Sequence, residues 1–134
     1  MSILVTVAVV AVAAIAAFMG LQLLLVRRMQ RKQGQPAPEL DGTAGKAISG
    51  GKSALFYFHS PMCGACKTMT PEVERLARSH QGRVFPVDIS VDMATARSFG
   101  VMATPTTIVV ERGVIQQVLI GPQPKTRLEG LVAV

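Results

Sequence analysis

An uncharged apolar run at the start of the chain is the feature that most limits what the rest can form. Residues 2–26 contain no charged side chain and consist mainly of valine, alanine, leucine and isoleucine. A helix of this length can cross a hydrocarbon core of about 30 Å. We therefore expect a transmembrane helix over residues 2–26, and the remainder of a 134-residue chain leaves room for one small globular domain.

A cleavable signal peptide is the alternative to a retained anchor. Such a peptide needs a positive charge before its apolar run, a shorter run, and a small-residue cleavage site after it. Here no basic residue precedes the run, and a basic cluster follows it directly, formed by Arg27, Arg28, Arg31 and Lys32. These features favour a retained anchor in the cell membrane. They also predict a cytoplasmic C-terminal domain, because basic residues beside a membrane helix tend to stay on the cytoplasmic side; a periplasmic domain is the alternative.

The net charge of +6 does not indicate a nucleic-acid-binding protein. The basic cluster holds four of the 14 basic residues, and the ten that remain are nearly balanced by eight acidic ones. Basic residues at the end of an apolar helix are explained by membrane topology and anionic headgroups. We therefore expect the chain to be embedded in a membrane and to bind no nucleic acid.

Residues 27–52 connect the apolar run to the first predicted strand. After the basic cluster, residues 33–52 are rich in glycine, proline, serine and alanine and have neither helical nor strand periodicity. We expect a basic juxtamembrane segment and a flexible linker without regular structure here, with the globular domain over residues 53–134.

Short apolar runs and amphipathic stretches follow one another through the predicted domain. Strands are expected over residues 54–59, 84–89, 106–110 and 114–120, and helices over residues 63–79, 94–99 and 125–134. Pro71 lies inside the first of these helices, where its ring removes a hydrogen bond and should kink the helix. The element order predicts an α/β domain with a mixed four-stranded sheet flanked by helices.

Both cysteines of the chain lie in one motif, Cys63-Gly64-Ala65-Cys66, where a predicted strand ends and a helix begins. The first turn of a helix has unpaired amides and a positive dipole end, so a thiolate at Cys63 should be stabilised and its pKa lowered below about 8.5. Cys63 is then the attacking nucleophile. Cys66, one turn further on, is placed to attack the mixed disulfide that Cys63 forms with a substrate. The motif predicts a thiol–disulfide oxidoreductase with no cofactor beyond its own dithiol.

Other uses of two cysteines fit the sequence less well. A c-type haem site needs a histidine after the second cysteine, where this chain has Lys67. A structural zinc site needs two more ligands, and His59 and His80 are badly spaced for known zinc modules. Two inert thiols remain an alternative, because reactivity depends on an electropositive and accessible setting. A separate alternative is an accessory or assembly subunit of a membrane complex, in which the dithiol is vestigial or delivers a metal.

Several further motifs combine with the cysteines in a specific pattern. They are residues 55–67, Pro71 in the following helix, Val87-Asp88, residues 99–106 with Thr104-Pro105, Gly113 and Gly121. Over roughly residues 53–132 the chain thus resembles the thioredoxin superfamily. The resemblance implies disulfide-containing protein substrates and an upstream thiol reductant or oxidant. In a cytoplasmic domain the expected direction is reduction of the substrate.

The resemblance also implies which residues contact the substrate. Pro105 should follow a cis peptide bond beside the dithiol, with the backbone of Thr104 presented to an incoming substrate strand; a trans proline that opens a strand is the alternative. Met62, Gly64 and Ala65, which surround the cysteines, complete the expected substrate contacts.

The chain departs from the family pattern at informative positions. The buried acid of many thioredoxins falls at Tyr57 and its partner lysine at Pro86, so the resemblance does not explain how Cys66 loses its proton. Family members usually begin with an additional strand and helix, for which residues 33–52 offer no suitable sequence. We therefore expect a trimmed domain with the strand of residues 84–89 at the sheet edge, where Pro86 is tolerated.

Overall fold

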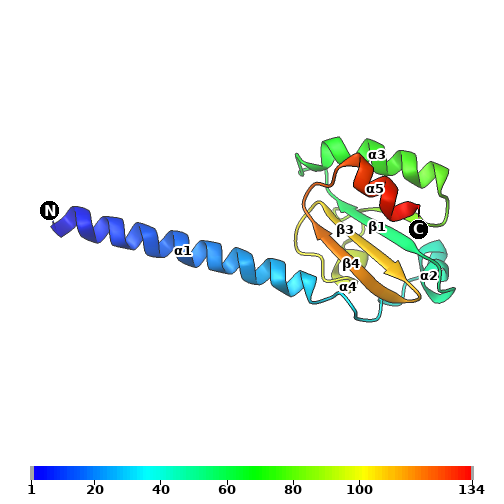
Figure 1. Ribbon diagram of the computed structural model, residues 1–134, viewed down its shortest axis with the longest axis horizontal. Coiled ribbons are helices and arrows are strands. Elements are labelled where there is room, and N and C mark those ends of the chain that lie inside the picture. The colour runs from blue at the N-terminus through cyan, green and yellow to red at the C-terminus, as the bar shows by residue number, and fades with distance from the viewer. Residues whose placement is uncertain (1, 134) are drawn as a thin grey trace.

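The computed structural model describes residues 2–133 of the protein. A long helix, α1 (Ser2–Gln30), projects from a small domain in which helices cover a sheet (Figure 1). The remaining elements are α2 (Gly42–Ser49), β1 (Ala54–His59), α3 (Cys66–Ser79), β2 (Val84–Asp88), α4 (Met93–Ser98), β3 (Thr106–Glu111), β4 (Val114–Ile120) and α5 (Lys125–Val132). Most predicted elements agree with these within one or two residues, although α3 begins later than expected, at Cys66.

The sheet has four strands in the order β2-β1-β3-β4. β1 pairs with β2 in parallel, and the β1–β3 and β3–β4 pairs are antiparallel, which confirms the predicted mixed sheet. β2 is an edge strand and Pro86 on it is exposed, as expected for a residue that cannot donate to a sheet ladder. β3 and β4 are joined by Arg112 and Gly113, whose φ angles of 52° and 74° fit a two-residue hairpin turn.

Alternate residues of β1 face two separate hydrophobic layers. Phe56 and Phe58 are buried on the side that α2 and α4 cover, where Phe99 packs against both rings. Leu55 and Tyr57 are buried on the other side, under α3 and α5 (Figure 1). This alternation follows from the two-residue period of a strand. It explains why an unbroken apolar run forms the centre of the sheet.

The prediction of a linker without regular structure is wrong for residues 42–49, which form α2. Ala47 and Ile48 of this helix are buried in the core. Gly45 is needed inside it, because a Cβ there would overlap the backbone of Leu40. A short helix held by such packing, rather than by residues of high helix propensity, leaves little periodicity in the sequence. The expectation that no helix precedes β1 is therefore wrong as well.

The connection between α1 and α2 is also ordered, because it lies along β4. Gly34 donates to the carbonyl of Ile115 at 2.7 Å, and the amide of Ile115 donates back to the carbonyl of Gln35 at 2.9 Å. Further along, the amide of Ala37 donates to Gly113 at 2.8 Å. Met29 at the end of α1 is buried in the core of the domain. The expected flexible linker is thus a docked segment that fixes the domain to α1.

Candidate active site

Cys63 and Cys66 form a disulfide at the carboxyl end of β1, in the loop that leads into α3. Their Cα atoms are 5.3 Å apart. The amide of Cys63 donates to Ser60 and that of Lys67 donates to Gly64, so two turns precede the regular helix. Cys66 is buried at 2% exposure, whereas Cys63 is partly exposed. A partner disulfide can therefore reach the first sulfur and not the second.

The first amide of α3 points at the Cys63 sulfur. The amide of Cys66 donates to Sγ of Cys63 at 3.2 Å, and Ala65 at the N-cap position supplies no side-chain cap. The sulfur thus occupies the place where a capping oxygen usually satisfies a first-turn amide. A negative charge on this sulfur would be stabilised by the same amide and by the positive end of the helix dipole.

Tyr57 lies beneath the dithiol, at the position where the resemblance puts a buried acid. Its side chain is fully buried, and its hydroxyl donates to the carbonyl of Cys66 at 3.3 Å. The hydroxyl of Thr70 lies 3.0 Å away and donates to Tyr57, since the one phenol proton is used on the carbonyl. Burial raises the pKa of Tyr57, and the bond with Thr70 lowers it by less. The phenol is therefore a proton donor that joins β1 to the first turns of α3.

A cavity of about 400 Å³ lies beside the disulfide and is lined by both cysteines, His59, Lys67, Thr70 and Asp88 among others. The imidazole of His59 stacks on the ring of Tyr57, with centroids 5.2 Å apart. Asp88 of β2 pairs in register with His59. The pKa of Asp88 is lowered by hydrogen bonds from the Ser90 hydroxyl and amide and, less strongly, by the charge of His59.

The stacking of His59 on Tyr57 was not predicted from the sequence. It could have been predicted, because residues two apart on a strand lie on the same face of the sheet.

The segment before β3 reaches the same end of the sheet. The Thr104–Pro105 peptide bond is cis, Pro105 is buried, and Thr104 is partly exposed. Thr106, the next residue, pairs with Phe58 near the end of β1. Met62, Gly64 and Ala65 are exposed in the loop around the cysteines. The residues expected to contact substrate are thus brought to one end of the sheet.

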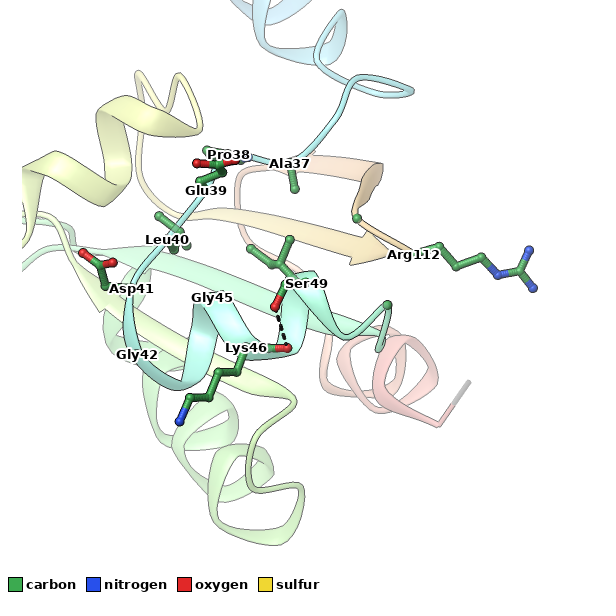
Figure 2. A pocket seen from close by; sticks show the side chains of 13 residues that line it. Ala37, Pro38, Glu39, Leu40, Asp41, Gly42, Gly45, Lys46, Ser49 and Arg112 are labelled. Carbon is green, nitrogen blue, oxygen red and sulfur yellow. Dashed lines mark hydrogen bonds between the residues drawn. The ribbon is translucent and has the colours of Figure 1, made fainter.

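A larger cavity lies elsewhere in the described part of the chain. It measures about 860 Å³ and lies between residues 37–51 and the β3–β4 turn, at the opposite end of the sheet from the disulfide. Figure 2 shows that the charged groups of Asp41, Lys46 and Arg112 point away from one another. Because no polar groups converge there, the smaller cavity beside the cysteines is the better candidate site.

A thioredoxin family model matches residues 44–133 of the chain. The thioredoxin of Alicyclobacillus acidocaldarius is 37% identical over 95 residues, which cover 69% of this chain and 90% of that protein. The thioredoxin of Haemophilus influenzae is 35% identical over 80 residues, covering 58% of this chain and 75% of that protein.

Solved structures of thioredoxins share the fold. A mutant thioredoxin from Halobacterium salinarum superposes with a TM-score of 0.56 at 27% identity, covering 65% of this chain and 77% of that one. Oxidised mitochondrial thioredoxin 3 from Saccharomyces cerevisiae gives a TM-score of 0.54 at 25% identity, with 66% and 83% covered. With its paired cysteines in a disulfide, the chain belongs to the thioredoxin family and is a thiol–disulfide oxidoreductase.

Proposed function

We propose that the protein is a membrane-tethered oxidoreductase in which Cys63 is the nucleophile and Cys66 the resolving thiol. The observation that carries this assignment is the contact between the Cys66 amide and the Cys63 sulfur at the start of α3. It favours the thiolate at the exposed cysteine, where a substrate can be attacked. The buried cysteine reacts second, with the sulfur beside it.

The reaction transfers two electrons to the substrate. The thiolate of Cys63 attacks one sulfur of a substrate disulfide, the substrate bond breaks, and the other substrate sulfur leaves as a thiolate. Cys66 then loses its proton and attacks the Cys63 sulfur. This step breaks the mixed disulfide, releases the second substrate thiolate, and forms the disulfide seen in the structure. An upstream dithiol restores the reduced enzyme by the reverse exchange.

The substrate strand lies across the end of the sheet, between the loop that holds the cysteines and the loop before β3. The backbone of Thr104 hydrogen-bonds to it, and Pro105 closes the floor of the site. Met62, Gly64 and Ala65 contact the residues that flank the substrate disulfide. Exposure of the last three supports this placement.

Replacing the resolving thiol should trap the substrate. In Cys66→Ser the mixed disulfide on Cys63 has no internal thiol to release it, so covalent adducts accumulate and turnover with insulin as a test disulfide is lost. Non-reducing electrophoresis and a reduction assay measure both effects. Cys63→Ser is the matched control, which should lose turnover without forming adducts. Adducts in Cys63→Ser, or full turnover in Cys66→Ser, would contradict the assigned roles.

His59 is the base that accepts the Cys66 proton in this proposal. Tyr57 cannot serve, because burial raises its pKa and keeps the phenol protonated. Asp88 is a poor base, because its pKa is lowered. A ring nitrogen of a neutral imidazole can accept a proton, and the stacking on Tyr57 holds the His59 ring at the cavity wall.

Removal of this base should slow resolution. His59→Phe keeps a ring on Tyr57 and removes the base, so decay of the mixed disulfide at pH 7 should slow by about a hundredfold or more, the range of general-base effects. Rapid-mixing measurements of this decay in the native protein and the variant test the expectation. His80→Phe, at the far end of α3, is the control, and equal decay rates for the two variants would refute the role of His59.

We further propose that α1 is a retained membrane anchor. It is long and apolar enough to span a bilayer. Its most apolar stretch of 18 residues has a mean hydropathy of 2.7, and none of that stretch is buried in the protein. A signal sequence near the N-terminus would pass the same test, but the basic cluster at Arg27 and Arg28 favours retention. In this proposal residues 2–26 cross the bilayer, residues 27–41 are juxtamembrane, and the redox domain starts at α2 on the cytoplasmic side.

A C-terminal fusion to alkaline phosphatase or to a fluorescent protein tests the anchor and its direction together. The account predicts that the fluorescent fusion is active, the phosphatase fusion is silent, and the full-length chain stays in the membrane after carbonate extraction. Changing Arg27, Arg28, Arg31 and Lys32 together to Gln removes the topological signal and should weaken the asymmetry. An active phosphatase fusion on the native sequence would reverse the proposed orientation, and release of a shortened chain would indicate cleavage.

A further inference from the structure

Four large apolar side chains are exposed in the described residues that follow α1. Their exposed fractions are 94% for Met62, 85% for Val91, 45% for Met93 and 55% for Met102. They lie in or beside three loops: residues 60–65 after β1, residues 89–92 after β2, and residues 99–105 before β3. Exposed apolar residues gathered at one site mark an interaction surface more often than scattered ones do.

All three loops lie at the end of the sheet that carries the dithiol. β1 and β2 are parallel, so the loops that follow them leave at the same end. β3 runs antiparallel to β1, so the loop that precedes β3 enters at that end too. We call this end of the domain, with its four apolar side chains and the two cysteines, the redox face.

The helix α1 leaves the domain on the side of the redox face. Arg28 and Lys32 line one cavity with Gly100 and Met102, so the end of α1 adjoins the loop before β3. From there the chain runs away from the redox face, because Gln33 bonds to Val118 and residues 34–37 then bond to Ile115 and Gly113. Figure 1 shows α1 extending beyond the side on which the arrowhead of β4 lies. β4 ends there at Ile120, which pairs with Thr106 beside Pro105.

We infer that the redox face rests on the bilayer that α1 enters, so that the substrates are membrane-embedded proteins whose disulfides lie at headgroup depth. This inference rests on the proposed membrane anchor. The docked connector supports it, because it holds the redox face toward the bilayer instead of letting the domain swing freely.

Charge favours a lipid surface as the occupant of the redox face. Arg28, Lys32 and Arg97 line the cavity beside Met102, where they can meet anionic headgroups. Two carboxylates also lie at this end, but each is engaged within the domain: Asp88 accepts hydrogen bonds from Ser90, and Asp92 caps α4 through the Thr95 amide. Methionine and valine side chains lose unfavourable contact with water when they enter the bilayer interface.

Tryptophan fluorescence can measure this placement directly, because the native chain contains no tryptophan. Met62→Trp and Val91→Trp each place one fluorophore on the redox face. Gln81→Trp is the matched control, since Gln81 is exposed just after the opposite end of α3. The full-length variants are reconstituted in vesicles of phosphatidylcholine and phosphatidylglycerol, with and without bromine on the acyl chains. We expect strong quenching for the first two variants and little for the third.

Equal quenching of all three variants, or no quenching of Val91→Trp, would overturn the inference. The vesicles contain no other protein, so an unquenched redox face would mean that lipid is not what covers its apolar residues. Failure of the chain to enter the vesicles would overturn the inference together with the anchor. Insulin reduction by Val91→Trp, measured in parallel, reports on the dithiol chemistry alone and should equal that of the native chain.

A second variant tests the substrate class. Val91→Asp combined with Met93→Asp adds charge to the redox face without altering the cysteines. The test substrate is a transmembrane peptide whose disulfide lies one helical turn outside its apolar segment. The variant should reduce this disulfide about tenfold more slowly than the native chain does, because the added charge lowers the effective concentration of the dithiol at the peptide disulfide. Insulin reduction should not change. Equal rates of the variant and the native chain on the peptide would contradict the inference.

Discussion

The contact between the first amide of α3 and the Cys63 sulfur depends on how firmly the helix is held over β1. Tyr57 provides that hold, because its buried hydroxyl bonds to the Cys66 carbonyl and to Thr70. Tyr57 thus occupies the position where the resemblance puts a buried acid, but it does not act as a base. A protonated phenol orders the helix start but cannot remove a proton. In the proposed mechanism, His59, which stacks on the same tyrosine, accepts the proton of the resolving thiol instead.

The helix α1 and the redox domain are parts of one rigid unit. Met29 at the end of α1 is buried in the domain, and the following residues bond along β4. A freely moving tether would let the dithiol sample a large volume of solution. If α1 spans a bilayer as proposed, the docked connector restricts the dithiol to one side, which lowers its access to soluble disulfides and raises its effective concentration at disulfides on the membrane surface.

Much of this architecture follows from local sequence patterns. The strands were predictable because β1 is an unbroken apolar run and β3 and β4 flank a glycine turn, and the dithiol was predictable from its place between strand and helix. α2 was not, because Ala47 and Ile48 gain their stability from burial and Gly45 is required by the backbone of Leu40. The docked connector was also missed, since backbone hydrogen bonds to β4 leave no trace in side-chain periodicity. The regular helix α3 begins at Cys66 and not at Cys63, because the amides of Cys63 and Lys67 bond to Ser60 and Gly64 in turns that precede it.

The central claim is that the Cys63 sulfur is ionised near neutral pH because it lies at the amino end of α3. Its most direct test is the rate of iodoacetamide alkylation of the reduced full-length chain as a function of pH, with Cys66 replaced by Ser so that one thiol reacts. The account predicts a half-maximal rate well below the value of about 8.5 that an unperturbed thiol would give. A midpoint at or above that value would contradict it.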